Sequence, residues 1–221
     1  MLLCCLSLFA VWYEPTDIDK ASKPWVGGRG HLLSFASPNL NELRSICTYL
    51  DLGKLMDSKA VAAVGKNSSE EENKTQQLLK TVLTTAAPLL TSLHALMVTL
   101  GPLGFMILRQ ATSSTLDSPL LPLTQMGTQE ETCEEECMCV GLYYPAPRSP
   151  DIVSVSGAGD CLAAGFITGM LEGRSVSECA SGGQAAAQLS LAASPAVPAS
   201  LTPAVLPWHH PLPYTLIRKD S

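Results

Sequence analysis

The chain has 221 residues, of which 46% are hydrophobic and 15% are charged. This composition supplies one sizeable apolar core and fits a single α/β domain better than two small domains. The formal net charge of −6 argues against a nucleic-acid partner, because binding to a phosphate backbone depends on clustered Lys and Arg side chains.

The first residues, MLLCCLSLFAVWY, allow two interpretations. One is a signal peptide, since an apolar run of suitable length ends near a small residue, but no basic residue precedes the run. The other, which we favour, is a buried strand over residues 8–14, because strands covered on both faces read as continuous apolar runs. The polar exit of that strand is Glu14-Pro15-Thr16-Asp17. We therefore expect no membrane association.

Alternating strand and helix patterns follow. The patterns predict a polar connection at 17–30, a strand at 31–36, a helix at 40–50, a helix at 75–93, and a strand at 95–100 with a hairpin-like partner at 105–108. Beyond these, residues 111–138 are rich in Ser, Thr, Pro and Glu and predict a disordered acidic insertion. We expect the acidic run in this insertion to face water; the alternative of a divalent-cation site is weaker, because the run has no spaced turn residues that would make its carboxylates converge.

The last third of the chain continues the alternation. It predicts a strand at 140–144, an apolar run at 152–155, helices at 161–171 and 176–191, and an irregular tail at 207–221. Strands and helices that alternate in this way imply an α/β fold with three layers, in which helices cover both faces of a mainly parallel sheet.

The eight cysteines do not form the pattern of a secreted, disulfide-bonded domain. Three stand singly among apolar or small residues, namely Cys47, Cys161 and Cys179. Such positions are typical of buried free thiols and favour a reducing compartment, which predicts a cytoplasmic protein and leaves a mitochondrial location open. A second group, Cys133, Cys137 and Cys139, has no His or further Cys pair nearby to complete a tetrahedral zinc site.

The segment Gly157-Ala158-Gly159-Asp160 carries the clearest chemical signal. Small residues at the start of a helix let backbone N–H groups approach an anion, and the helix dipole adds positive potential at the same place. A carboxylate there is explained either by helix capping or by phosphoryl transfer. In phosphoryl transfer, a positioned carboxylate accepts the proton of the attacking hydroxyl group while the N–H groups stabilise the transferring phosphate.

Residues 154–167, SVSGAGDCLAAGFI, resemble the C-terminal signature of the PfkB carbohydrate and nucleoside kinases. The resemblance implies a ribokinase-like fold and assigns Gly157, Ala158 and Gly159 to an anion hole for the γ-phosphate of ATP. It assigns Asp160 to the catalytic base. Many family members begin the motif with Asp where this chain has Ser154, which leaves the role of that side chain open.

Two further segments resemble motifs of the same family in the expected order. Asn39 and Glu42 match an Asn-x-x-Glu motif that places Mg²⁺ largely through water; the alternative is a helix cap by Asn39 with an exposed Glu42. Thr99, Gly101 and Gly104 match a Thr-x-Gly-x-x-Gly turn beside the nucleotide phosphates; the alternative is an ordinary hairpin turn.

The resemblance covers roughly Val11 to Leu206, and we interpret residues 1–206 as a partial kinase domain. Family members also carry an N-terminal half with a Gly-Gly substrate motif, a residue that binds the acceptor and a β lid, and nothing before Val11 supplies them. The expected function is an ATP-dependent kinase acting on a primary hydroxyl group of a sugar or nucleoside. The alternative is a non-catalytic fragment that binds nucleotide or a protein partner. A homodimer is left open.

Within that function the resemblance leans toward one branch of the family. Residues 12–17 and 37–43, WYEPTD and SPNLNEL, are similar to pseudouridine kinases. This similarity predicts pseudouridine as the acceptor, while a ribose or other sugar kinase remains the alternative.

Overall fold

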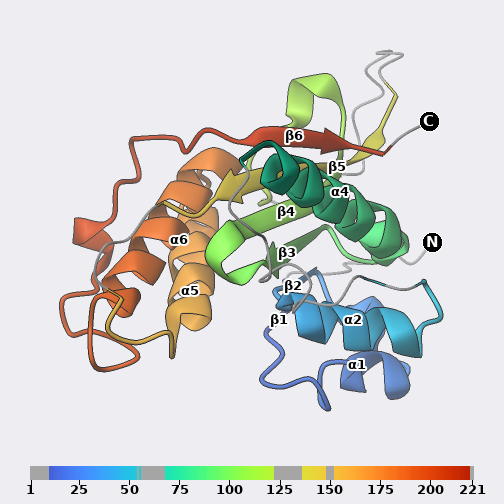
Figure 1. Cartoon of the computed structure of the whole chain (residues 1–221), viewed down its shortest axis with the longest axis horizontal. Helices are drawn as coiled ribbons and strands as arrows, with labels where there is room; N and C mark the ends of the chain where they lie inside the picture. The colour runs from blue at the N-terminus through green and yellow to red at the C-terminus, as the bar shows by residue number, and fades with distance from the viewer. Residues whose placement is uncertain (1–9, 54, 56–67, 122–135, 148–151, 220–221) are drawn as a thin grey trace, which may run out of the picture.

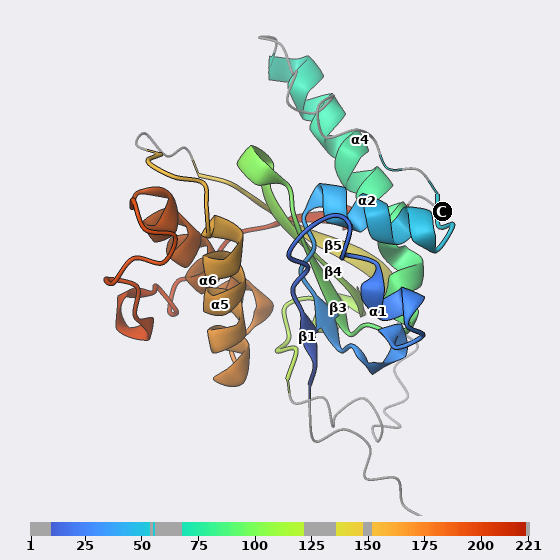
Figure 2. The ribbon, with the colours of Figure 1, turned by 90° about the horizontal axis from the view of Figure 1, so that it is seen from below.

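The computed structural model describes residues 10–53, 55, 68–121, 136–147 and 152–219. In these residues one six-stranded sheet lies between two groups of helices, so the fold has three layers (Figures 1 and 2). The sequence prediction of a three-layer α/β/α fold is therefore confirmed.

The elements follow one another in a strand and helix alternation. They are β1 (Trp12–Tyr13), α1 (Lys23–Val26), β2 (Phe35–Ala36), α2 (Leu40–Tyr49), α4 (Ser68–Ala86), β3 (Ala95–Thr99), β4 (Gly104–Ala111), β5 (Met138–Pro145), α5 (Ala158–Leu171), α6 (Val176–Leu191) and β6 (Thr215–Arg218). The helices predicted at 40–50 and 176–191 coincide with α2 and α6. The helix predicted at 75–93 begins earlier, at Ser68, and ends at Ala86 in a 3₁₀ turn over Ala87–Thr91.

The strands lie in the sheet in the order in which they occur in the chain, β1-β2-β3-β4-β5-β6. β1, β2 and β3 pair in parallel, whereas β3–β4, β4–β5 and β5–β6 are antiparallel pairs. The prediction of a mainly parallel sheet is therefore wrong. The chain reverses after β3 through a turn at Gly101–Leu103, and two adjacent strands joined by so tight a turn can pair only antiparallel.

Each face of the sheet has its own apolar core. On one face, α2 and α4 place Ile46 and Leu83 against Val98 of β3. On the other, α5 places Phe166 against Met97 of β3. Successive residues of a strand point to opposite faces, so β3 is buried on both sides. This double burial explains why its sequence reads as a continuous apolar run.

The predicted strand at 8–14 is present only as Trp12–Tyr13, and residues 1–9 lie outside the described residues. The run at 31–36 contributes only Phe35–Ala36 to the sheet, after a 3₁₀ turn at Gly30–Leu32. Residues 152–155 form no strand. The N–H groups of Val153 and Ser154 instead donate to the carbonyl of Leu191 at the end of α6.

The described residues of the predicted insertion at 111–138 pack against the domain. Ala111 ends β4 and Met138 begins β5, while residues 122–135, which carry most of the acidic run, lie outside the described residues. Between them, Leu120 is buried against the core beside α5 and α6. Asp117 accepts a hydrogen bond from the N–H of Ser177 at 2.6 Å. The segment up to Leu121 is therefore a packed part of the domain.

The C-terminal segment is not wholly irregular, contrary to the prediction for 207–221. Thr215–Arg218 forms β6, which pairs antiparallel with β5. Ile217 is buried in the core beneath α4. Pairing and burial together stabilise a four-residue strand that the surrounding prolines conceal in the sequence.

Candidate active site

A cavity of about 280 Å³ lies where β1, β2 and β3 end, next to the first turn of α5. It is lined by Glu14, Pro15, Thr16, Ser37, Asn39, Glu42, Thr99, Gly159 and Asp160. In sheets with parallel strands, ligands bind beyond the carboxyl ends of those strands. A larger hollow of about 490 Å³ is lined by described residues of α4 and includes none of the predicted site residues. The smaller cavity is therefore the candidate site.

Gly157 sets the direction in which α5 begins. It is the N-cap of the helix, with a left-handed backbone (φ +81°) and no side-chain hydrogen bond to the cap. A Cβ atom added to Gly157 would lie 2.6 Å from the carbonyl oxygen of Ala196, so only glycine fits this position. The first N–H groups of a helix have no partner within the helix. Here no capping side chain occupies them, and they are oriented to bind an anion.

Asp160 lies in the first turn of α5, is exposed and lines the cavity. Burial is the main cause that raises the pKa of both Glu14 and Glu42, and the carboxylate of Asp160 adds to both shifts. Three carboxylates therefore share the cavity, and none of the described residues that line it is a Lys or Arg. A polyphosphate would be repelled by this set unless a cation lies between them.

Asn39 and Glu42 form a capping box at the start of α2. The Asn39 side chain accepts from the N–H of Glu42 at 3.0 Å, and Glu42 Oε2 accepts from the N–H of Asn39 at 2.8 Å. The capping alternative therefore describes Asn39 correctly. The same alternative predicted that Glu42 is exposed, and this is wrong, because the residue is only 5% exposed. Burial raises the pKa of Glu42 above its usual value.

The turn after β3 places one of its three predicted residues in the cavity. Thr99 lines the cavity and its N–H donates to Pro38 at 3.1 Å, beside the bridge to Asn39. Gly101 and Gly104 do not line it. Gly104 has a φ of +104°, and a Cβ atom there would lie 2.2 Å from the carbonyl oxygen of Tyr144. This glycine permits the close approach of β4 and β5.

Glu14 was not among the predicted site residues. Its carboxylate accepts a hydrogen bond from the hydroxyl of Ser37, whose oxygen accepts one from Trp12 Nε1 at 2.6 Å. Burial raises the pKa of Glu14 to about 7, although these hydrogen bonds oppose the shift. The signal in the sequence was its position directly after an apolar run, because parallel strands present such residues at the ligand-binding edge of a sheet.

The comparison with protein families concerns the second half of the chain. Residues 135–202 match the pfkB family carbohydrate kinase model. The matched range includes β5, the turn at Gly157, α5 and α6. No curated protein matches the chain.

Solved kinase structures share the fold. A nucleoside kinase from Methanocaldococcus jannaschii, an archaeal member of the ribokinase family, superposes with a TM-score of 0.51 and 17% identity, over 90% of this chain and 46% of that one. A ribokinase from Cryptococcus neoformans in complex with ADP gives 0.50 and 18%, over 86% and 50%. A carbohydrate kinase from Agrobacterium tumefaciens gives 0.50 and 14%, over 94% and 48%. The chain therefore has the ribokinase-like fold and spans about half the length of these structures.

The chemistry of the cavity fits Mg²⁺. Its side-chain donors are carboxylate, amide and hydroxyl oxygens, which hard divalent cations prefer. Among the described residues, no three His, Cys, Asp or Glu side chains converge closely enough to hold a metal ion directly. Mg²⁺ gives up its water reluctantly and usually keeps several water ligands. The arrangement therefore fits an ion held largely through water.

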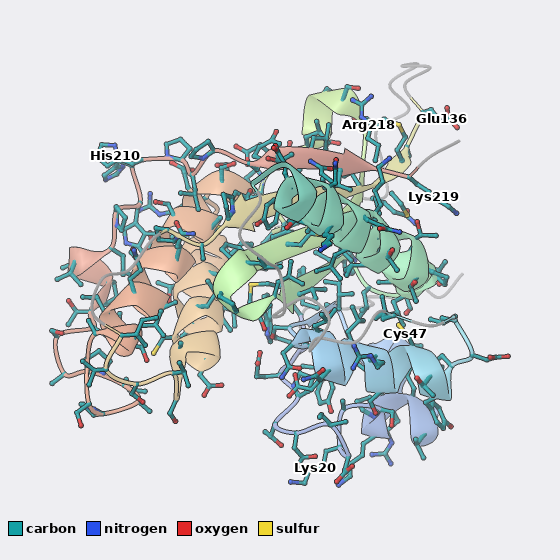
Figure 3. The ribbon with its side chains drawn as sticks, viewed as in Figure 1. Lys20, Cys47, Glu136, His210, Arg218 and Lys219 are labelled. Atoms are coloured by element: carbon teal, nitrogen blue, oxygen red, sulfur yellow. The ribbon has the colours of Figure 1, made fainter. Side chains whose placement is uncertain are left out.

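The cysteines within the described residues are free thiols. Cys47, Cys161 and Cys179 are buried, as predicted. In Figure 3, Cys47 lies on the side of α2 that faces α4, and burial raises the pKa of its thiol to about 11. Cys137 is exposed and Cys139 half-buried, while Cys133 lies outside the described residues. No helix in the described part of the chain is long and apolar enough to cross a membrane.

Proposed function

We propose that the chain is a PfkB-type kinase that transfers the γ-phosphoryl group of ATP to a primary hydroxyl group of a sugar or nucleoside. One observation carries the proposal. Residues from three separately predicted motifs, Asn39 with Glu42, Thr99, and Gly159 with Asp160, line a single cavity. The family match at 135–202 supports the same conclusion. The chain spans about half the length of a kinase structure with this fold, so we propose the kinase activity for this chain from its cavity and its family match.

In this mechanism Asp160 accepts the proton of the acceptor hydroxyl as that oxygen attacks the γ-phosphorus, while the bond from the γ-phosphorus to the bridging oxygen of the β-phosphate breaks and ADP leaves. The N–H groups at Gly157, Ala158 and Gly159 hold the charge on the transferring phosphoryl group, and the dipole of α5 adds to their effect. Thr99, at the carboxyl end of β3, contacts the nucleotide phosphates. Gly101 and Gly104 shape the turn that presents Thr99.

Asn39 and Glu42 would hold Mg²⁺ through water, and the carboxylate of Glu14, which lines the same cavity, would offer a further oxygen. When bound, the ion neutralises charge on the nucleotide phosphates. Glu42 is fixed for this task by its hydrogen bond to the N–H of Asn39. The capping box and the ion site thus use the same two residues.

The acceptor that we propose is pseudouridine, from the similarity of residues 12–17 and 37–43 to pseudouridine kinases. The domain boundary at residue 206, the homodimer and the cytoplasmic location stay predictions. All are separable from the proposed chemistry, because the cavity is built from residues 14–160 of one chain.

The test is a phosphotransfer assay of the full chain with ATP, Mg²⁺ and a panel of pseudouridine, uridine, ribose and fructose. We expect Asp160→Asn to lower kcat by about 10²–10⁴-fold, the usual contribution of a general base. The matched control is Glu172→Gln, which removes an exposed carboxylate from the other end of α5. It is expected to change kcat less than about twofold.

Turnover that is unaffected by Asp160→Asn would contradict the assigned base. Calorimetry with ATP and Mg²⁺ completes the test. Nucleotide binding without turnover on any acceptor would replace the proposed kinase by the nucleotide-binding alternative.

A further inference from the structure

Ser190 connects three segments that meet behind the candidate phosphate-binding turn. It lies in the last turn of α6 and is 0% exposed. Its hydroxyl oxygen is 2.7 Å from the carbonyl oxygen of Ala196 and 3.4 Å from that of Ser156. A serine hydroxyl has one proton to donate, so the bond to Ala196 dominates and Ser156 shares it. The hydroxyl thereby ties α6 to the loop at Ala196 and to the residue before Gly157.

Ala196 forms the wall against which the turn rests. Its carbonyl oxygen and Cβ lie 2.6 and 2.7 Å from where a Cβ of Gly157 would be. The thiol of Cys161, one turn into α5, also lies 3.5 Å from the same carbonyl oxygen. Ala196 therefore packs directly against Gly157, and the Ser190 hydroxyl donates to the carbonyl of that same Ala196.

The neighbouring residue of α6 holds the approach to the turn. The carbonyl of Leu191 accepts hydrogen bonds from the N–H groups of Val153 at 2.8 Å and Ser154 at 3.2 Å. The last carbonyl groups of a helix have no partner within the helix, and here one of them is used to fix another segment. The C-terminal end of α6 thus binds the residues that precede the turn in sequence and, through Ala196, contacts Gly157 itself.

We propose that Ser190 is a positioning residue of the candidate active site, which holds the Gly157 turn so that the N–H groups of Gly157, Ala158 and Gly159 converge on one point. The proposal rests on the proposed function. N–H donors stabilise charge in a transition state only if they are fixed beforehand. Displacement of such groups by about 1 Å costs on the order of 100-fold in rate.

Ser181 supplies a matched control on the same helix. It is also buried, at 7% exposure, and its hydroxyl donates to the carbonyl of Pro207 at 3.3 Å. Ser181 and Ser190 therefore each tie α6 to the C-terminal segment by one hydroxyl-to-carbonyl bond. Only Ser190 reaches the turn, so a Ser→Ala change at both positions separates loss of a buried hydroxyl from loss of turn positioning.

The first measurement is amide hydrogen exchange, which requires no activity. The N–H groups of Ser154 and Cys161 are hydrogen-bonded to Leu191 and Gly157. We expect both to exchange about fivefold faster in Ser190→Ala, the change that losing one hydrogen bond of typical net strength produces. They should exchange at the original rate in Ser181→Ala. Unchanged exchange in Ser190→Ala, or equal acceleration in both variants, would overturn the proposal.

The second measurement separates kcat from KM. Ser190→Ala should lower kcat by about 10–100-fold and change the KM for ATP less than about threefold, because mispositioned donors lose contact with the transition state more than with bound ATP. Ser190→Thr keeps the hydroxyl and should recover most of the lost kcat. Equal losses in folded Ser190→Ala and Ser190→Thr would assign the effect to packing and overturn the role of the hydroxyl.

The two measurements distinguish the failure of this proposal from the failure of the proposed function. Should the unmodified chain lack turnover, the proposed function fails, and amide exchange alone still decides whether Ser190 positions the turn. Should the chain be active and exchange at the turn remain unchanged, the positioning role fails and the kinase proposal stands.

Discussion

Two glycine-containing turns, the one at Gly157 and the one between β3 and β4, have different roles in this fold. The turn at Gly157 presents Gly159 and Asp160 to the cavity, whereas the turn between β3 and β4 contributes Thr99 and keeps Gly101 and Gly104 outside it. Both contain a glycine with positive φ whose side-chain position is blocked, at Gly157 by Ala196 and at Gly104 by Tyr144. A glycine-rich motif therefore does not by itself identify a contact with phosphate.

Gly159 differs from both blocked glycines. It has no positive φ, and a Cβ atom added there would meet nothing within 4 Å. Neither backbone conformation nor packing therefore requires glycine at this position, although glycine weakens a helix relative to alanine. It lines the cavity, so close approach of a ligand is the remaining physical reason for the missing side chain.

The largest expected effect on stability is at Gly104 in the β3–β4 turn, and the other glycine of that turn, Gly101, should show a smaller one. Gly104→Ala is expected to lower the free energy of unfolding by about 4 kcal/mol, because a backbone conformation reserved for glycine costs about 1–3 kcal/mol and overpacking about 1–3 kcal/mol more. Gly101→Ala, with positive φ but open space, should cost about 1 kcal/mol. Urea denaturation of both variants provides the measurement; equal losses would refute the role of the Tyr144 contact.

A smaller effect on stability is expected at the turn before α5. There Gly157 has the positive φ and the blocked side-chain position, whereas Gly159 lines the cavity. Gly157→Ala should lower the free energy of unfolding by about 2 kcal/mol through its left-handed backbone and the Ala196 contact. Gly159→Ala should leave stability unchanged or raise it by about 0.5–1 kcal/mol, yet weaken ATP binding about tenfold in calorimetry. Full ATP affinity in Gly159→Ala would remove the argument for ligand contact at that residue.

The smallest expected effect on stability concerns Glu14, whose carboxyl group lines the cavity. The pKa of Glu14 is raised by burial to about 7, so between about pH 4.5 and 7 the folded state binds more protons than the unfolded state. The contribution of Glu14 to the free energy of unfolding must then fall as pH rises through this window. We expect a loss of about 1 kcal/mol, discounted for solvent that still reaches the carboxyl.

Urea denaturation at pH 5 and pH 7.5 checks this expectation. Glu14→Gln removes the titrating group and should flatten the difference between the two values. The neighbouring Glu42, whose pKa is also raised, remains in the variant, so a small slope in the same direction should persist. An unaltered slope in Glu14→Gln would place the titration elsewhere.

The sequence predicted those elements whose signals are local. The helical spacing of Leu43 and Ile46 predicted α2, and both side chains are fully buried. The run at 95–100 predicted β3 because both faces of that strand are covered. The motif residues were predicted by similarity, and their meeting in one cavity depends on the strands ending at a common edge, which no single motif contains.

The remaining features depend on contacts between segments far apart in the chain. β6 exists because it pairs with β5 and buries Ile217, while the prolines around it indicate irregular structure. Leu120 is buried in the core that includes residues of α5 and α6, although Ser and Thr are frequent in the sequence around it. Glu14 belongs to the site because Ser37, 23 residues later, holds it there. Periodicity within a short window carries none of this information.

The identity of strand order and chain order has a consequence for how the fold forms. In the part of the chain that the structure describes, each strand after the first pairs with the strand that precedes it in sequence, so none of these strands has to insert between two strands already in place. The four-residue connection of β3 and β4 carries a small loop-closure entropy, whereas β5 and β6 are joined by a long one that includes two helices. We therefore expect the β3–β4 hairpin to belong to the folding nucleus and β6 to join after the transition state, with φ-values near zero.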